Sequence, residues 1–164
     1  MSKPNQLCRT VARFHALPEG MRTWAVSKVL GKVVPLVGTA GLRYDVITPE
    51  RVVVSIRNQR KVQNHIRGVH AAAMALLAET ATGFCVGMNV PDDKLPLIKT
   101  LKVDYHKRSQ GDMRAEASLT AAQIQQIQTL DKGEVTVAVR ITDASGQEPI
   151  QAEMVWAWVP KKRD

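Results

Sequence analysis

Aromatic residues and cysteines are scarce in this sequence, and low-complexity linkers are absent. Only 4% of the 164 residues are Phe, Trp or Tyr, so few flat side chains could stack on the bases of a single-stranded nucleic acid. The two cysteines are Cys8 and Cys85, and Cys85 lies inside an apolar segment, so we expect no disulfide framework. No apolar run with a small-residue cleavage site follows the first basic residues. We therefore expect a cytoplasmic protein.

Common catalytic motifs are missing as well. The sequence contains no G-x-S-x-G, no G-x-x-x-x-G-K-[ST], no H-E-x-x-H and no C-x-x-C. The histidines are His15, His65, His70 and His106, and none has acidic or sulfur partners at the spacing of metal ligands. We expect neither a metal nor a bound cofactor.

Positive charge is in excess, with a formal net charge of +8 at pH 7. This balance suits an anionic partner such as a nucleic acid, an acidic membrane surface or a phosphate-rich cofactor, but it also serves solubility alone. The shortage of aromatic residues disfavours nucleic acid. At 164 residues, 45% of them hydrophobic, the chain is long enough for one domain, residues 1–164, with its own core.

The stretch from Val69 to Met88 is almost entirely apolar, and Glu79 lies in its middle. A run of this length could span a membrane, but a central Glu, internal glycines and charged flanks favour a buried helix of a soluble protein, so we expect no membrane insertion. A carboxyl that loses its water has a raised pKa, which suits a general base. The alternative is a structural Glu that is hydrogen-bonded to a neighbouring strand or subunit.

The N-terminal part predicts one amphipathic helix that opens at Pro18 and Glu19 and ends near Pro35, after residues 1–17, which have no clear pattern. Its apolar stripe is expected to pack on the same domain or on a partner subunit, although such a helix could also lie on a membrane surface. The stripe consists of Met21, Trp24, Ala25, Val29, Val33 and Leu36.

Period-two alternation predicts about six strands around the central helix. A hairpin covers residues 42–56 with a turn at 48–50, and further strands cover 101–105, 113–119, 135–141 and 150–158, with a short helix near 124–130. In the third of these strands Leu101, Val103 and Tyr105 share one face. Clean alternation is typical of an antiparallel sheet covered on one side, so the fold class is α+β, with the sheet wrapped around the helix.

Asn64, His70 and Glu79 are the remaining candidates for a site. Nine helical steps separate His70 from Glu79, which places them roughly 13 Å apart on opposite faces of the helix. If both serve one site, two copies of the helix must pass each other in a twofold dimer. The alternative is that His70 is a structural residue unrelated to Glu79.

These residues carry a resemblance to a known family. Asn64, then His70 followed by Ala71 and Ala72, then the segment from Leu77 to Ala81, resemble the N-x5-H-G-G…L-A-[DE]-x-A signature of hotdog-fold acyl-CoA thioesterases. The group is the PaaI-like and 4-hydroxybenzoyl-CoA thioesterase-like one, and the segment from Thr100 to Asp112 is similar to it too. The resemblance implies a hotdog core at 41–160, with residues 1–40 as an N-terminal helical extension.

The resemblance also implies roles. Glu79 would act as general base or nucleophile, the backbone N–H of Ala71 would hold the oxyanion, and His70 and Asn64 would orient the thioester and the water. Ala71 and Ala72 replace the two glycines of the signature, and their methyl groups narrow the path by which a substrate reaches the start of the helix. Further residues are candidates for contact with the substrate: Arg57, Arg60, Lys61, Arg67, Gly68, Thr80, Gly83, Lys107 and Arg108. The basic residues among them would meet the phosphates of coenzyme A.

Taken together, the resemblance implies hydrolysis of acyl-CoA thioesters at the interface of a homodimer, which could pair further into a homotetramer. Coenzyme A would enter as part of the substrate and not as a cofactor. The alternative is a non-catalytic hotdog protein that binds acyl-CoA or acyl-carrier protein. A dehydratase is disfavoured because no H-F-P-G segment is present.

Overall fold

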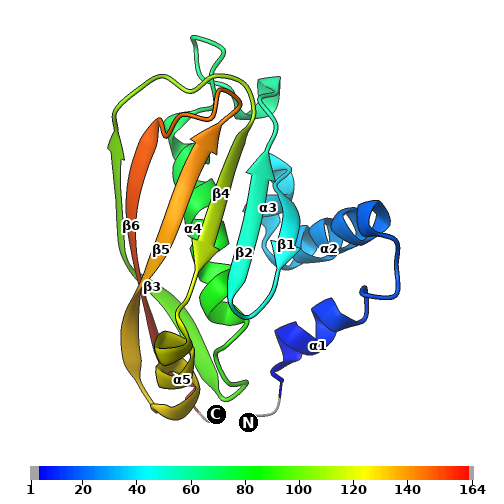
Figure 1. Cartoon of the computed structure of the whole chain (residues 1–164), viewed down its shortest axis with the longest axis vertical. Coiled ribbons are helices and arrows are strands. Elements are labelled where there is room, and N and C mark those ends of the chain that lie inside the picture. The colour runs from blue at the N-terminus through cyan, green and yellow to red at the C-terminus, as the bar shows by residue number, and fades with distance from the viewer. Residues whose placement is uncertain (1–3, 163–164) are drawn as a thin grey trace.

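Six strands form one antiparallel sheet in the order β1-β2-β4-β5-β6-β3 in the computed structural model, which describes residues 4–162 (Figure 1). β1 (Arg43–Ile47) and β2 (Arg51–Ile56) make the predicted hairpin. The other strands are β3 (Lys94–Tyr105), β4 (Met113–Ser118), β5 (Gly133–Asp143) and β6 (Ile150–Pro160). The fold is α+β, as the alternation predicts.

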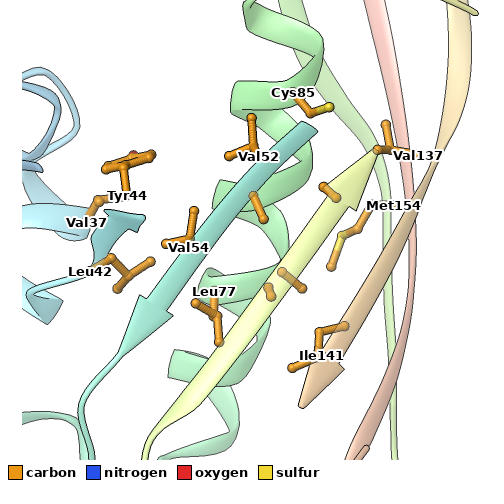
Figure 2. Packing of buried hydrophobic residues seen from close by; sticks show 14 of the residues in the cluster. Val37, Leu42, Tyr44, Val52, Val54, Leu77, Cys85, Val137, Ile141 and Met154 are labelled. Atoms are coloured by element: carbon orange, nitrogen blue, oxygen red, sulfur yellow. The ribbon is translucent and has the colours of Figure 1, made fainter. Parts of the chain in front are cut away.

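The central helix α4 (Ala71–Gly87) packs against one face of this sheet. Leu77, Ala78, Ala81 and Cys85 have no exposed surface. Small side chains on β4 give the helix room: Ala115 and Ala117 pair with Val54 and Val52 of β2, and all four residues are fully buried. Figure 2 shows Leu77 and Cys85 of the helix behind Val52 and Val54 of β2. A sheet wrapped around one helix is the predicted hotdog arrangement.

Three helices precede the sheet. α2 (Glu19–Val33) matches the predicted amphipathic helix, whereas α1 (Gln6–Ala12) and α3 (Pro35–Ala40) were not expected as separate helices. Residues 4–17 therefore contain more structure than the sequence pattern indicated. In Figure 1, α2 and α3 lie beside β1, and α1 lies near the lower end of the molecule.

The buried face of α2 differs from the predicted stripe. Val26 and Leu30 are buried, whereas Met21, Trp24 and Val33 are 58%, 65% and 69% exposed. Two contacts set this orientation. The Tyr44 N–H donates to Ser27 Oγ at 2.9 Å, and Gly31 of α2 lies against Gly38 of α3. Most of the stripe is therefore not covered by the same domain, and its packing on a partner subunit stays a prediction.

β3 is an edge strand with apolar side chains in solvent. Leu101 and Tyr105, which the alternation placed on a shared face with Val103, are 47% and 49% exposed, whereas Val103 packs against the core, so that face is covered only in part. Leu95, Leu97 and Ile98 are also exposed. The strand pairs only with β6, along its whole length, which leaves its other backbone edge free within the described chain.

Two shorter elements complete the fold. The predicted short helix is α5 (Ala121–Thr129), which begins with a capping box between Thr120 and Gln123. The polar loop before α4 contains the 3-10 turn η1 (Arg60–Val62). Within residues 4–162, no helix has both the length and the apolar character needed to cross a bilayer.

Candidate functional site

The start of α4 gathers several predicted site residues around one hollow. Its volume is about 360 Å³. Asn64, Gly68 and Ala71 line the hollow together with the basic residues Arg67, Lys107 and Arg108. Asn58, Ile66, Met74, Tyr105, Ser109 and Gly111 complete it. The loop before the helix and the segment after β3 therefore meet at the helix N-terminus.

Asn64 shapes the loop that carries these groups. Its Oδ1 accepts hydrogen bonds from the N–H groups of Ile66 and Gly68, both at 3.1 Å, and its own N–H donates to the Gly68 carbonyl at 2.9 Å. The turn holds Arg67 at a φ of 62°, a left-handed conformation that is uncommon for a residue with a side chain. The Asn64 Nδ2 group donates no hydrogen bond within residues 4–162 and is free to meet a ligand.

His70 caps α4 and presents its second ring nitrogen outward. Its Nδ1 accepts from the Ala72 N–H at 3.0 Å, so the proton of the neutral ring is assigned to Nε2. The Ala71 N–H is the first of the helix and has no acceptor in the described part of the chain. The Tyr105 hydroxyl donates to the Ala71 carbonyl at 2.8 Å and ties this turn to β3. Free donors at the positive end of a helix suit an anionic or developing negative charge.

Glu79 lies on the wall of a different cavity, of about 240 Å³. It is the one charged residue lining this cavity, and it forms no ion pair with any residue between 4 and 162. Burial raises the pKa of the Glu79 carboxyl above its ordinary value, and the nearby Thr80 hydroxyl offsets part of that rise. The rest of the lining is Leu7, Val34, Val37, Thr80, Gly83, Phe84, Gly87, Pro96 and Trp156.

Two buried hydroxyls near Glu79 have no hydrogen-bond partner of good geometry among the described residues. They belong to Thr80 and Tyr44, which are both only 2% exposed. Burial raises the pKa of the Tyr44 hydroxyl, and the negative charge of Glu79 is the second, smaller cause of the rise. The Tyr44 ring meets Phe84 edge to face, with centroids 4.8 Å apart. Unpartnered buried hydroxyls are uncommon, and here they lie beside the candidate base.

Within one chain the two groups of candidates stay apart. Thr80 and Gly83 accompany Glu79, whereas Asn64 and Ala71 line the hollow at the helix start. Eight residues of α4 separate Ala71 from Glu79, which is about 12 Å along the axis. One chain therefore does not assemble the predicted constellation.

The predicted basic residues are also divided. Arg67, Lys107 and Arg108 lie at the start of α4, but Arg57 lines a separate groove of about 670 Å³ with Lys28, Lys32 and Arg43. The Lys61 ammonium lies toward that groove, against Gly41, where an added Cβ would be 2.8 Å from it. Arg60 is exposed on η1. No three His, Cys, Asp or Glu residues between positions 4 and 162 are grouped so that they could hold a metal ion.

The model of the family described as "Domain of unknown function (DUF4442)" matches residues 22–159. The chain belongs to the DUF4442 family. No curated protein matches the sequence. The match begins inside α2 and ends in β6, so α1 lies outside the part that this DUF4442 protein shares with the family model.

Solved structures are similar to the DUF4442 chain over most of its length. One is a protein of unknown function from Pseudomonas aeruginosa, called a probable thioesterase, with 24% identity, a TM-score of 0.76, and coverage of 88% of this chain and 97% of that one. A putative thioesterase from Shewanella oneidensis has 13% identity and a TM-score of 0.71, covering 84% and 97%. A thioesterase from Haemophilus influenzae has 10% identity and a TM-score of 0.63, covering 82% and 90%. These likenesses confirm the predicted hotdog fold.

The surroundings of Glu79 in this DUF4442 protein were largely missed from the sequence. Tyr44 falls within the predicted hairpin at 42–56, but no spacing connects it with Glu79, which lies 35 positions later. Trp156 was likewise assigned only to the last strand, and Leu7 fell in a segment without a pattern. Their proximity to Glu79 depends on how α1, β1 and β6 pack around α4.

Proposed function

We propose that this protein hydrolyses acyl-CoA thioesters to the free acid and coenzyme A, with Glu79 as general base or nucleophile. The observation that carries the proposal is a partly buried carboxyl with a raised pKa on the wall of an apolar cavity, without a cation beside it. A structural Glu would be expected to have a partner, because an unpaired buried carboxylate is costly. Similarity to structures called thioesterases supports the reaction class.

In the proposed reaction, Glu79 takes a proton from a water molecule while the water oxygen attacks the thioester carbonyl carbon. The N–H of Ala71 of the partner subunit, at the start of its helix, would stabilise the oxyanion that forms. The C–S bond then breaks, and the proton passes from Glu79 to the departing sulfur. As a nucleophile, Glu79 would instead form a mixed anhydride that water hydrolyses in a second step.

The site is proposed to be completed by a second copy of the chain. Because Glu79 and His70 lie on opposite faces of α4, Glu79 can meet His70 of the partner subunit only if two helices pass each other. The exposed edge of β3, with Leu95, Leu97, Ile98 and Leu101 in solvent, supports association through this strand. An exposed apolar edge strand is a typical place for chains to pair.

Coenzyme A is proposed to bind with its phosphates near the start of α4. Arg67, Lys107 and Arg108 line the hollow there, and none of them pairs with an acid within the described residues. Guanidinium and ammonium groups are good phosphate ligands. Arg57, Arg60 and Lys61 do not line this hollow.

The test is hydrolysis of acyl-CoA esters by the wild type and by Glu79→Gln. The amide keeps the shape but cannot act as a base, so we expect the rate to fall about 10²- to 10⁴-fold while the fold and the oligomer are unchanged. Glu148→Gln, on an exposed turn where the side chain pairs with Arg140, is a matched control that should leave the rate unchanged. Full activity of Glu79→Gln would refute the assignment of the base.

A non-catalytic acyl-CoA binding protein is the second candidate. Ala71 and Ala72 stand where the signature of hotdog-fold acyl-CoA thioesterases has two glycines, so two methyl groups crowd the start of the helix. Tight binding of acyl-CoA by a wild type that shows no turnover would select this alternative.

A further inference from the structure

A second groove adjoins the cavity beside Glu79. The groove has a volume of about 460 Å³ and lies between α1, α2 and the end of α4. The two spaces share Leu7, Phe84, Gly87 and Pro96 in their linings. The cavity and the groove therefore meet at Leu7 and Gly87.

Glu79 and two glycines of α4 line the cavity. Glu79, Gly83 and Gly87 follow one another at intervals of four, so they lie on one face of the helix. A Cβ at Gly83 would lie 2.6 Å from the Trp156 ring, and one at Gly87 would lie 3.4 Å from Leu7 Cδ2. Trp156 therefore packs directly on the helix backbone, and Leu7 stands over the far end of the track.

The position of Leu7 is fixed by the anchoring of α1. Asn5 Nδ2 donates to the carbonyls of Gly87 and Val90, both at 2.7 Å, and Arg9 pairs with Asp92 at 3.0 Å. The Cys8 thiol donates to the Met88 carbonyl at 3.0 Å. These contacts all join α1 to the end of α4, so Leu7 is held where the cavity meets the groove.

We propose that the acyl group of the substrate is a medium-length aliphatic chain that lies along α4 from Glu79 to Gly87, and that Leu7 limits its length. This inference rests on the proposed function. The lining is apolar apart from Glu79 and Thr80, which suits a hydrocarbon. A cavity of about 240 Å³ holds about eight groups of the size of a water molecule or a methylene, at about 30 Å³ each. The track from Glu79 to Gly87 is about 12 Å long.

Two variants change the proposed limit in opposite directions. Leu7→Ala removes the side chain at the end and joins the cavity to the groove, so longer acyl chains should be accepted. Gly87→Ala adds a methyl group within ordinary contact distance of Leu7, at 3.4 Å, and should shorten the usable track. Leu130→Ala and Gly20→Ala are matched controls, because Leu130 is 45% exposed and an added Cβ at Gly20 meets nothing within 4 Å.

The experiment measures kcat/KM for straight-chain esters from butanoyl-CoA to palmitoyl-CoA and for benzoyl-CoA. For the wild type we expect a maximum near octanoyl-CoA. Leu7→Ala should gain about fourfold for each added methylene beyond the wild-type limit, because each newly buried methylene contributes that factor. Gly87→Ala should lose activity on the longest wild-type substrates and keep it on the shortest, while both controls follow the wild type.

Unchanged chain-length profiles in both variants, or a preference for benzoyl-CoA, would overturn the inference while leaving thioester hydrolysis intact. If the wild type hydrolyses none of the esters, the proposed function fails instead. The same esters are then titrated as ligands, and Kd is measured against chain length for Leu7→Ala and Gly87→Ala. The inference holds if Leu7→Ala shifts the preference to longer chains and Gly87→Ala shifts it to shorter ones. Circular dichroism identifies any variant that has lost its fold, and the opposite shift in the other variant still provides the test.

Discussion

Replacing Asn5 is expected to release α1 from the end of α4. This single side chain makes three hydrogen bonds: its Oδ1 accepts from the Cys8 N–H at 2.9 Å, which caps α1, and its Nδ2 donates to the Gly87 and Val90 carbonyls. The residue is 8% exposed although it lies near the N-terminus. Cap and anchor are thus combined in one amide.

Two variants separate the cap from the anchor. Asn5→Ser keeps a good helix cap but cannot reach the two carbonyls, so it should lose about 2 kcal/mol, at about 1 kcal/mol for each hydrogen bond. Asn5→Ala loses the cap as well, which adds about 1 kcal/mol and gives a total of about 3 kcal/mol. Gln6→Ala, with an exposed side chain in the same helix, is the control and should remain within about 0.5 kcal/mol of the wild type.

The assay combines urea unfolding with hydrogen exchange. If the free energy of docking α1 is smaller than the free energy of the hydrogen bonds removed, α1 detaches while the rest of the protein stays folded. The amides of residues 6–12 then lose protection against hydrogen exchange, and the free energy of global unfolding falls by less than the full amount. The order of protection should be wild type, then Asn5→Ser, then Asn5→Ala. Both variants should also hydrolyse longer acyl chains than the wild type does, because Leu7 moves with α1. Wild-type stability and protection in both would show that Asn5 does not anchor α1.

Four further predictions concern the carboxyl, the phenol and the sheet edge. Because burial raises the folded-state pKa of Glu79 above the ordinary 4.5, kcat/KM should fall with decreasing pH at a value above 4.5, as a pH–rate profile would show. The raised folded-state pKa also means that the free energy of unfolding of the wild type falls as the pH rises from 4.5 through that pKa. Glu79→Gln should therefore be more stable than the wild type at pH 7 and should lose this advantage below pH 4.5. Urea titrations at both pH values measure the difference. Tyr44→Phe should raise the free energy of unfolding by about 1 kcal/mol, because the hydroxyl is buried without a partner; a clear loss of stability would show that it holds Glu79 or a water. Leu101→Lys on the β3 edge should give a folded monomer without hydrolysis in sedimentation and activity assays, whereas Leu130→Lys should not; an active monomer would contradict the interface site.

The sequence predicted the strands and the two longest helices because their patterns depend on local periodicity. Alternation in 135–141 and 150–158 located β5 and β6, and the apolar run with His70 at its start located α4. The alternation together with the apolar helix suggested a sheet wrapped around that helix, and the resemblance then identified this arrangement as a hotdog fold. α1 was missed because its seven residues have no apolar stripe and its stability depends on Asn5 contacts eighty positions away.

The candidate site was predictable as a set of residues but not as a geometry. Glu79 stood out because a charged residue in an apolar helix is costly, and His70 because it opens that helix. The face of α2 that is buried could not be predicted, since Val26 and Leu30 compete with a larger stripe and only the contacts with β1 and α3 decide between them. The separation of Arg57 from Arg67 and Arg108 likewise follows from the path of the loop around η1.

The amino-acid sequence by itself determined which segments bury a face and which carboxyl loses its water, because both depend on side chains close together along the chain. Only the tertiary structure decided what surrounds that carboxyl: Tyr44, Trp156 and Leu7 come from three distant segments. The physical reason is that a cavity is the space that separate elements leave between them, so its shape depends on how all of these elements pack.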